Sequence, residues 1–80
     1  MKMVTLASGE QVPQPIFAAV RIALREFSTA ELREIKRLAQ NSDYKLRTGL
    51  SEKLHRRGLL KEDNEIHDLT RAIILDQVKD

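Results

Sequence analysis

In this 80-residue chain, the side chains that we consider first for catalysis or metal binding are those of Ser51, His55 and His67. Ser51 and His55 are four positions apart, the spacing at which two side chains meet on one face of a helix. A nucleophile and a base in this relation still need a group that orients the histidine and donors for an oxyanion, and the sequence offers neither. His55 and His67 match no zinc-ligand spacing, and the chain has no cysteine. We therefore expect no enzyme, no metal and no cofactor.

A second set of residues, basic or hydroxyl-bearing, is concentrated in residues 43–58. This segment has five lysines and arginines against two acidic residues, whereas residues 61–80 have three against six. The formal net charge of +2 conceals this contrast. Lysine and arginine donate to guanine and to phosphate, and hydroxyl groups serve either bases or backbone. The candidate nucleic-acid-binding residues are Lys45, Arg47, Thr48, Ser51, His55 and Arg56, with Arg33 and Arg37 as further candidates for phosphate contact.

The size of the chain limits what these residues can belong to. A protein of 9.2 kDa makes one small domain, which is too small for a two-domain enzyme or a roomy buried active site. Hydrophobic residues make up 41% of the chain but aromatic residues only 4%, so the expected core is mostly leucine. The sequence has no apolar run of membrane-spanning length and no signal-peptide pattern. We therefore expect a soluble, cytoplasmic protein without a membrane partner.

The N-terminal half contains the signals of a short hairpin followed by two helices. Residues 4–6 and 11–12 are candidate strands around a Ser8-Gly9 turn, within an extended segment over residues 1–13. The apolar spacing that follows predicts a first helix over residues 16–26. Ser28 and Glu31 form a capping box, which predicts that a second helix covers residues 29–40.

The third predicted helix carries most of the candidate site. Leu46, Leu50 and Leu54 repeat every four residues, which predicts one apolar face and a helix over residues 44–57 that ends at Gly58. Gly49 weakens this helix by about 1 kcal/mol relative to alanine. Its presence is explained either by close approach of a neighbouring element or by a break in the helix, with Ser51 as the cap of the second piece.

Two short apolar segments after Gly58 surround a polar turn and predict a β-hairpin within residues 59–70. Residues 71–80 fit both helix and strand, and we favour a helix capped by Thr70. The apolar side chains of this last segment either close the core or form the seam of a homodimer. These side chains are Ile73, Ile74, Leu75 and Val78.

The order of these elements resembles the winged helix-turn-helix family of DNA-binding regulators over residues 16–70. The most specific part is Leu54-His55-Arg56-Arg57-Gly58-Leu59-Leu60, which is similar to that family's exit from the recognition helix into the first wing strand. The resemblance implies that residues 29–40 support residues 44–57 in the major groove, with Lys45, Arg47, Thr48 and Ser51 near bases and with His55 and Arg56 near phosphates. The chain departs from the family at the acidic wing tip Glu62-Asp63-Asn64-Glu65, so we expect no contact between this wing and DNA.

The sequence therefore predicts a single, mainly α domain with a small β-hairpin and a winged helix-turn-helix-like three-helix core. The expected function is transcriptional regulation through duplex DNA, with no small-molecule site and with a possible homodimer through residues 71–80. The alternative is a non-catalytic protein–protein interaction module on the same scaffold, because a fold of this type does not dictate nucleic-acid binding.

Overall fold

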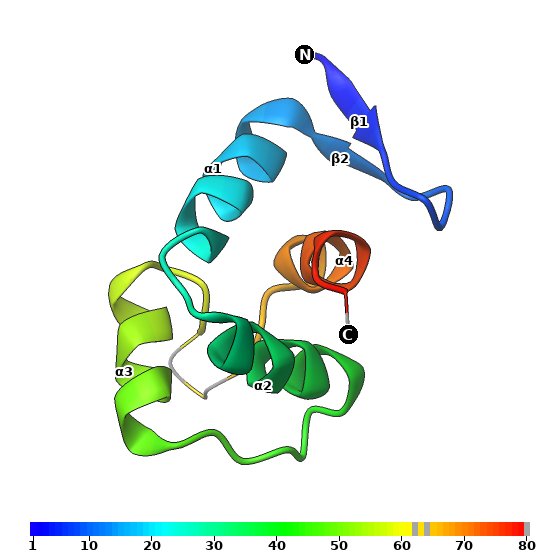
Figure 1. The fold of residues 1–80 in the computed structure, drawn as a ribbon. Coiled ribbons are helices and arrows are strands. Elements are labelled where there is room, and N and C mark those ends of the chain that lie inside the picture. Colours follow the sequence, from blue (N-terminus) through cyan, green and yellow to red (C-terminus); the bar gives the residue numbers. More distant parts are fainter. Residues whose placement is uncertain (62, 64, 80) are drawn as a thin grey trace.

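The computed structural model describes residues 1–61, 63 and 65–79, which form four helices and one two-stranded antiparallel sheet (Figure 1). A mainly helical fold with a small hairpin is therefore confirmed. Glu62, Asn64 and Asp80, which belong to the predicted wing tip and C-terminal segment, lie outside the described residues. In chain order the elements are β1 (Met3–Thr5), β2 (Gln11–Pro13), α1 (Gln14–Leu24), α2 (Thr29–Gln40), α3 (Thr48–Arg56) and α4 (Asp68–Gln77).

β1 and β2 form the hairpin expected in the N-terminal segment. Val4 pairs with Val12 at the centre of the register, and Val12 is completely buried. Gly9 has φ +92°, a left-handed conformation that glycine adopts without steric cost, and it closes the turn. The backbone N–H of Ala7 donates to the carboxylate of Asp76 at 2.8 Å, which ties this turn to α4.

α1 and α2 follow from local signals in the sequence. α1 begins at Gln14, two residues before the predicted start, because Pro15 is compatible with the first helical turn. α2 has the predicted bounds. The Ser28 hydroxyl accepts from the Glu31 N–H at 3.2 Å, and the Glu31 carboxylate accepts from the Ser28 N–H at 2.8 Å. This capping box confirms the predicted start of α2.

The third helix is shorter than the sequence suggests. The prediction of a helix over residues 44–57 is wrong at its start, because α3 begins at Thr48 and Arg47 is its extended N-cap. The Asn41 side chain accepts from the Asp43 N–H at 3.0 Å and forms a turn that competes with helix. Leu46 still packs against the core from this extended segment. The four-residue repeat of leucines therefore predicted burial correctly at Leu46 but assigned it to the wrong backbone conformation.

Neither explanation offered for Gly49 holds within the chain. Gly49 lies in the first turn of α3, and a Cβ atom added there would have nothing within 4 Å. No neighbouring element approaches it in the described part of the chain. The helix also continues unbroken from Thr48 to Arg56, so Ser51 does not cap a second piece.

Among the described residues of the segment after Gly58, the predicted hairpin is reduced to a single bridge between Leu60 and Ile66. The Lys61 N–H donates to the Glu65 carbonyl at 2.8 Å, but residues 68–70 are helical rather than extended. Their side chains do not alternate across a sheet, because α4 already begins at Asp68. Thr70 is consequently a buried residue inside α4 and not its cap. The predicted boundary at residue 70 falls inside a helix.

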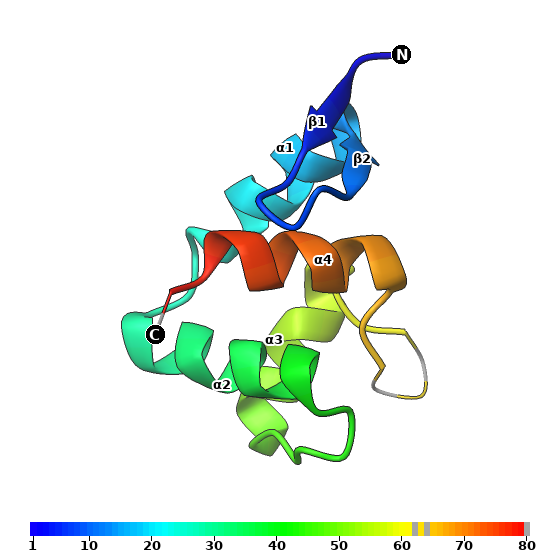
Figure 2. The ribbon, with the colours of Figure 1, turned by 90° about the vertical axis from the view of Figure 1, so that its right-hand side faces the viewer.

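α4 lies at the centre of the fold and packs against both α1 and α2 (Figures 1 and 2). The helix predicted after residue 70 is confirmed, and its side chains close the core of the domain. Ile73 and Ile74 are completely buried and Val78 nearly so, which removes three of the four residues proposed for a dimer seam. Leu75 alone of these four is exposed, at 40%. No helix that the structure describes has both the length and the apolar content to span a bilayer.

Candidate nucleic-acid interface

α3 is amphipathic in a way that separates its structural residues from its candidate functional residues. Leu50 and Leu54 are buried in the same core cluster as Ile35 and Leu38 of α2. The opposite side of α3 is exposed to solvent. At about 100° per residue, its exposed residues occupy an arc of roughly 120°. This outward face of α3 consists of Thr48, Gly49, Glu52, His55 and Arg56.

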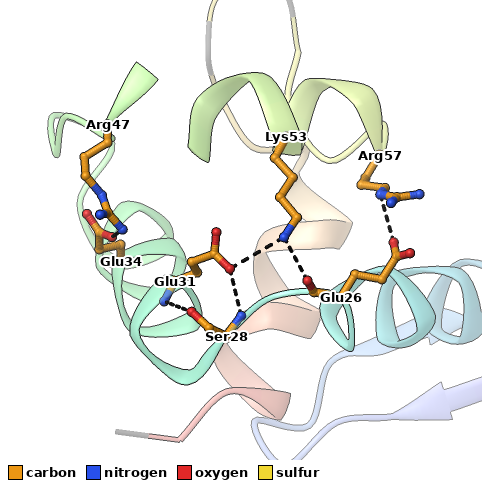
Figure 3. Close-up of polar contacts among 7 residues, drawn as sticks. All are labelled: Glu26, Ser28, Glu31, Glu34, Arg47, Lys53 and Arg57. Atoms are coloured by element: carbon orange, nitrogen blue, oxygen red, sulfur yellow. Dashed lines mark hydrogen bonds and ion pairs between the residues drawn. The ribbon is translucent and has the colours of Figure 1, made fainter. Parts of the chain in front are cut away.

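Lys53 fixes α3 to the junction between α1 and α2 (Figure 3). Its ammonium donates to the backbone carbonyl of Glu26 at 2.8 Å and lies 3.6 Å from the carboxylate of Glu31. The same ammonium lies 4.6 Å from the centre of the Phe27 ring, in cation–π geometry. Lys53 therefore contacts three parts of the fold: the backbone before α2, the capping residue Glu31 of α2, and the buried ring of Phe27.

Two arginines at the ends of α3 add ion pairs, one to α2 and one to the segment between α1 and α2. The Arg47 guanidinium lies 2.6 Å from the Glu34 carboxylate, although the Arg47 side chain remains 68% exposed. Arg57 lies 2.8 Å from the Glu26 carboxylate, and both of these side chains are nearly half exposed. Figure 3 shows these pairs on either side of Lys53. Three of the five basic residues in the 43–58 segment thus neutralise glutamates of the scaffold.

The structure separates the six predicted site residues into three groups. Thr48, His55 and Arg56 lie together on the outward face of α3, and Arg47 lies at its N-terminal end. Lys45 and Ser51 instead line a groove of about 440 Å³ beside the turn that precedes α3. That groove also contains Asp43, Asp63 and Glu65. Lys45 therefore lies in acidic surroundings, and the site predicted from sequence is not one continuous basic surface.

The other sequence candidates fall elsewhere. Arg33 and Arg37 are exposed on α2, as the helical spacing predicts. His67 is the N-cap residue of α4 and lies on a different element from His55. Among residues 1–61, 63 and 65–79, no group of three or more His, Asp or Glu side chains is placed to hold a metal ion.

Sequence reasoning missed the role of Lys53. Its position in α3 lies between the apolar face and the outward face, where a long side chain can reach an adjacent helix. Arg57 follows it by four residues on the same side of the helix. Two basic residues four positions apart, with acidic residues at and before the start of α2, could have indicated that ion pairs as well as leucine packing stabilise the position of α3.

Two carboxylates have pKa values below the ordinary range. The hydrogen bond from the Ser28 N–H lowers the pKa of Glu31, and the charge of Lys53 adds to this effect against an opposing contribution from burial. The hydrogen bond from the Ala7 N–H lowers the pKa of Asp76, with a further contribution from the Gln77 side chain. Both carboxylates therefore stabilise the fold in their ionised form.

The polar groups on the outward face of α3 are of types that form hydrogen bonds with nucleic acids. The outward face of α3 offers a hydroxyl, an imidazole, a carboxylate and a guanidinium on a helix fixed by Lys53, and these groups can donate to or accept from base edges and phosphates. Comparison of the chain with protein-family models, with curated proteins and with solved structures gave no match.

Proposed function

We propose that this chain is a small, non-catalytic DNA-binding protein that lays the outward face of α3 in the major groove of duplex DNA. In this proposal α2 and α3 act as a helix-turn-helix pair within a winged-helix-like core. The single bridge between Leu60 and Ile66 takes the place of a wing. The observation that carries the proposal is the outward face itself, which the rest of the described chain leaves uncovered while the opposite face is anchored in the core.

The proposal assigns different parts to the two ends of α3. Thr48 and Arg47 lie at the N-terminal end of α3, the end that most often reaches base edges in helix-turn-helix proteins. The pair between Arg47 and Glu34 is an exposed one, of a kind worth about 0–1 kcal/mol, so its guanidinium can exchange the carboxylate for a base or phosphate. Arg56, one turn beyond Glu52, is assigned to phosphate.

Glu52 gives the proposed interface a selective element. A carboxylate in the middle of the face repels phosphates but accepts a hydrogen bond from the exocyclic amine of cytosine. Repulsion between Glu52 and phosphate then lowers the affinity for a duplex of arbitrary sequence. A duplex with a cytosine opposite Glu52 offsets this loss with a hydrogen bond. Gly49 beside it has no side chain, which leaves room for a sugar-phosphate backbone to approach α3 closely.

The test is fluorescence anisotropy with labelled duplexes of random sequence, at about 50 mM and about 200 mM salt. We expect saturable binding at the lower salt that weakens at the higher salt, because phosphate contacts release counterions. Arg56→Ala should weaken binding of all duplexes. Arg21→Ala removes the same charge from α1, away from α3, and should leave binding unchanged. Absence of binding at low salt, or equal effects of the two variants, would refute the proposal.

A second candidate is a non-catalytic protein-interaction module. The observation that favours it is the pairing of Arg47, Lys53 and Arg57 with glutamates, because these pairs lower the net positive charge around α3. If the duplex titrations show no binding at low salt while the chain remains folded, this second candidate replaces the first.

A further inference from the structure

We infer that a groove between α1, the start of α2 and the end of α4 binds an acidic peptide segment that carries leucine or phenylalanine. The groove measures about 400 Å³. Its lining residues come from the last turn of α1 and the residue after it, the first turn of α2, and residues 77–79 at the end of α4 and after it. None of these residues belongs to the outward face of α3, so this inference is independent of the proposed DNA binding.

Three cationic side chains line the groove. Arg21 lies in the last turn of α1, Arg25 is the C-cap residue of this helix, and Lys79 follows α4. All three are exposed, and none forms an ion pair with another residue in the part of the chain that the structure describes. The basic residues around α3 differ, because glutamates neutralise three of them. Arg21 and Arg25 therefore form no ion pair among the described residues, although the Arg21 guanidinium lies 5.6 Å from the centre of the Phe17 ring. The charge of Lys79 acts on the Asp76 carboxylate and helps to lower its pKa.

The groove also has an apolar floor. Leu24 and Val78 form its buried part, and the side chain of Leu32 is only partly buried. Ile22 lies on the other side of Arg25 on α1 and is 64% exposed, the second most exposed large hydrophobic residue after Met1 among the described residues. A bound molecule could therefore contact the apolar floor between the cations and also Ile22 beside them.

The positive charges and the apolar floor of the groove together indicate what kind of molecule would bind there. Arg21 and Arg25 lie one helical turn apart and Lys79 comes from another part of the fold, so carboxylates spaced along a peptide can pair with all three. A leucine or phenylalanine between those carboxylates would cover the exposed part of Leu32. Duplex DNA has the negative charge but presents no comparable apolar side chain to the floor. Charge complementarity together with the apolar floor therefore favours an acidic, amphipathic peptide over nucleic acid.

The test uses a fluorescein-labelled twelve-residue peptide of alternating Asp or Glu and Leu or Phe, titrated with the intact chain at about 150 mM salt to screen distant charges. We expect saturable binding with a Kd below about 1 mM. The double variant Arg21→Gln/Arg25→Gln should weaken it at least about tenfold, which corresponds to about 1.4 kcal/mol. The matched control Arg33→Gln/Arg37→Gln removes the same charge from the exposed side of α2 and should change the Kd less than about twofold. Circular dichroism establishes that both variants are folded.

A second peptide, in which alanine replaces every leucine and phenylalanine, tests the apolar floor and should bind at least about tenfold more weakly. Equal weakening by the two double variants would mean nonspecific attraction between charges and would overturn the inference. So would equal binding of the two peptides, or the absence of saturable binding. Loss of duplex binding in Arg21→Gln/Arg25→Gln, with no peptide binding by the unaltered chain, would assign these arginines to nucleic acid instead.

Discussion

Replacement of Lys53 by methionine should destabilise the protein far more than its position on a charged helix suggests. Methionine keeps an apolar side chain over the Phe27 ring but removes the ammonium. The change eliminates the 2.8 Å hydrogen bond to the Glu26 carbonyl, the cation–π contact at 4.6 Å and the 3.6 Å ion pair with Glu31. The first two interactions connect α3 to the chain between α1 and α2, and the ion pair connects it to the first turn of α2.

The magnitude follows from these three interactions and from their partial exposure. A hydrogen bond to a charged group is worth about 1.5–3 kcal/mol, a cation–π contact about 0.5–1 kcal/mol and an exposed ion pair about 0–1 kcal/mol. The Lys53 side chain is 31% exposed, so water replaces part of what is lost. We expect a decrease of about 2 kcal/mol in the free energy of unfolding. For a domain of this size this corresponds to a decrease in Tm of roughly 8–16 °C.

The assay is thermal and urea denaturation followed by circular dichroism, with Arg57→Met as the control. Arg57 lies on the same side of α3, and its loss removes the same charge. Its pair with Glu26 is nearly half exposed at both side chains, so its loss should cost less than about 0.5 kcal/mol. If the two variants differ by less than about 0.5 kcal/mol, the argument that Lys53 joins three parts of the fold is refuted.

Three further predictions concern the stability of the protein at low pH, the stability of α3, and the effect of Glu52 on DNA binding. Because the pKa of Glu31 is lowered in the folded state, its stabilising effect is present above the ordinary glutamate range near pH ~4.3 and is lost as the pH falls through the lowered value. The urea midpoint should decrease from pH 6 to pH 3, less steeply in Glu31→Gln; parallel curves would contradict this. Gly49→Ala should raise the free energy of unfolding by about 0.5 kcal/mol, since the added Cβ meets nothing within 4 Å, and a lower Tm would contradict it. Glu52→Gln should tighten binding to random duplexes in the anisotropy assay while reducing discrimination among sequences, and unchanged affinity would remove Glu52 from the interface.

Local signals were sufficient for the parts of the fold that depend on neighbouring residues. The capping box at Ser28 fixed the start of α2, because its two hydrogen bonds join residues three positions apart. The Ser8-Gly9 turn likewise predicted the N-terminal hairpin. At both places the residues that determine the structure are close together in the sequence.

The errors arose where the spacing of apolar residues alone was taken to decide the backbone conformation. Leu46 repeats with the leucines of α3 but reaches the core from an extended segment, because the Asn41 side chain forms a turn there. Residues 68–70 have the composition of a strand end, yet α4 begins among them to bury Thr70 and Ile73 between α1 and α2. Neither outcome depends on local propensity alone.

The sequence predicted which types of side chain make up the candidate site, but only part of their arrangement in space. Periodicity alone placed Thr48, His55 and Arg56 on one face of a helix, and the structure agrees. The ion pair between Arg47 and Glu34, and the acidic surroundings of Lys45, depend on how α2, α3 and the segment after Gly58 pack. Arg47 and Glu34 are 13 positions apart, and Asp63 and Glu65 are distant in sequence from Lys45, so no local pattern specifies these neighbours.

Backbone amide NMR of the ¹⁵N-labelled chain, titrated with a duplex selected from the random pool, tests most directly whether α3 reads DNA. We expect the largest chemical-shift changes at Thr48, Glu52 and Arg56, with little change in β1 and β2 on the far side of the fold. Changes concentrated instead around Arg21, Arg25 and Lys79, or no change at saturating duplex, would contradict this prediction.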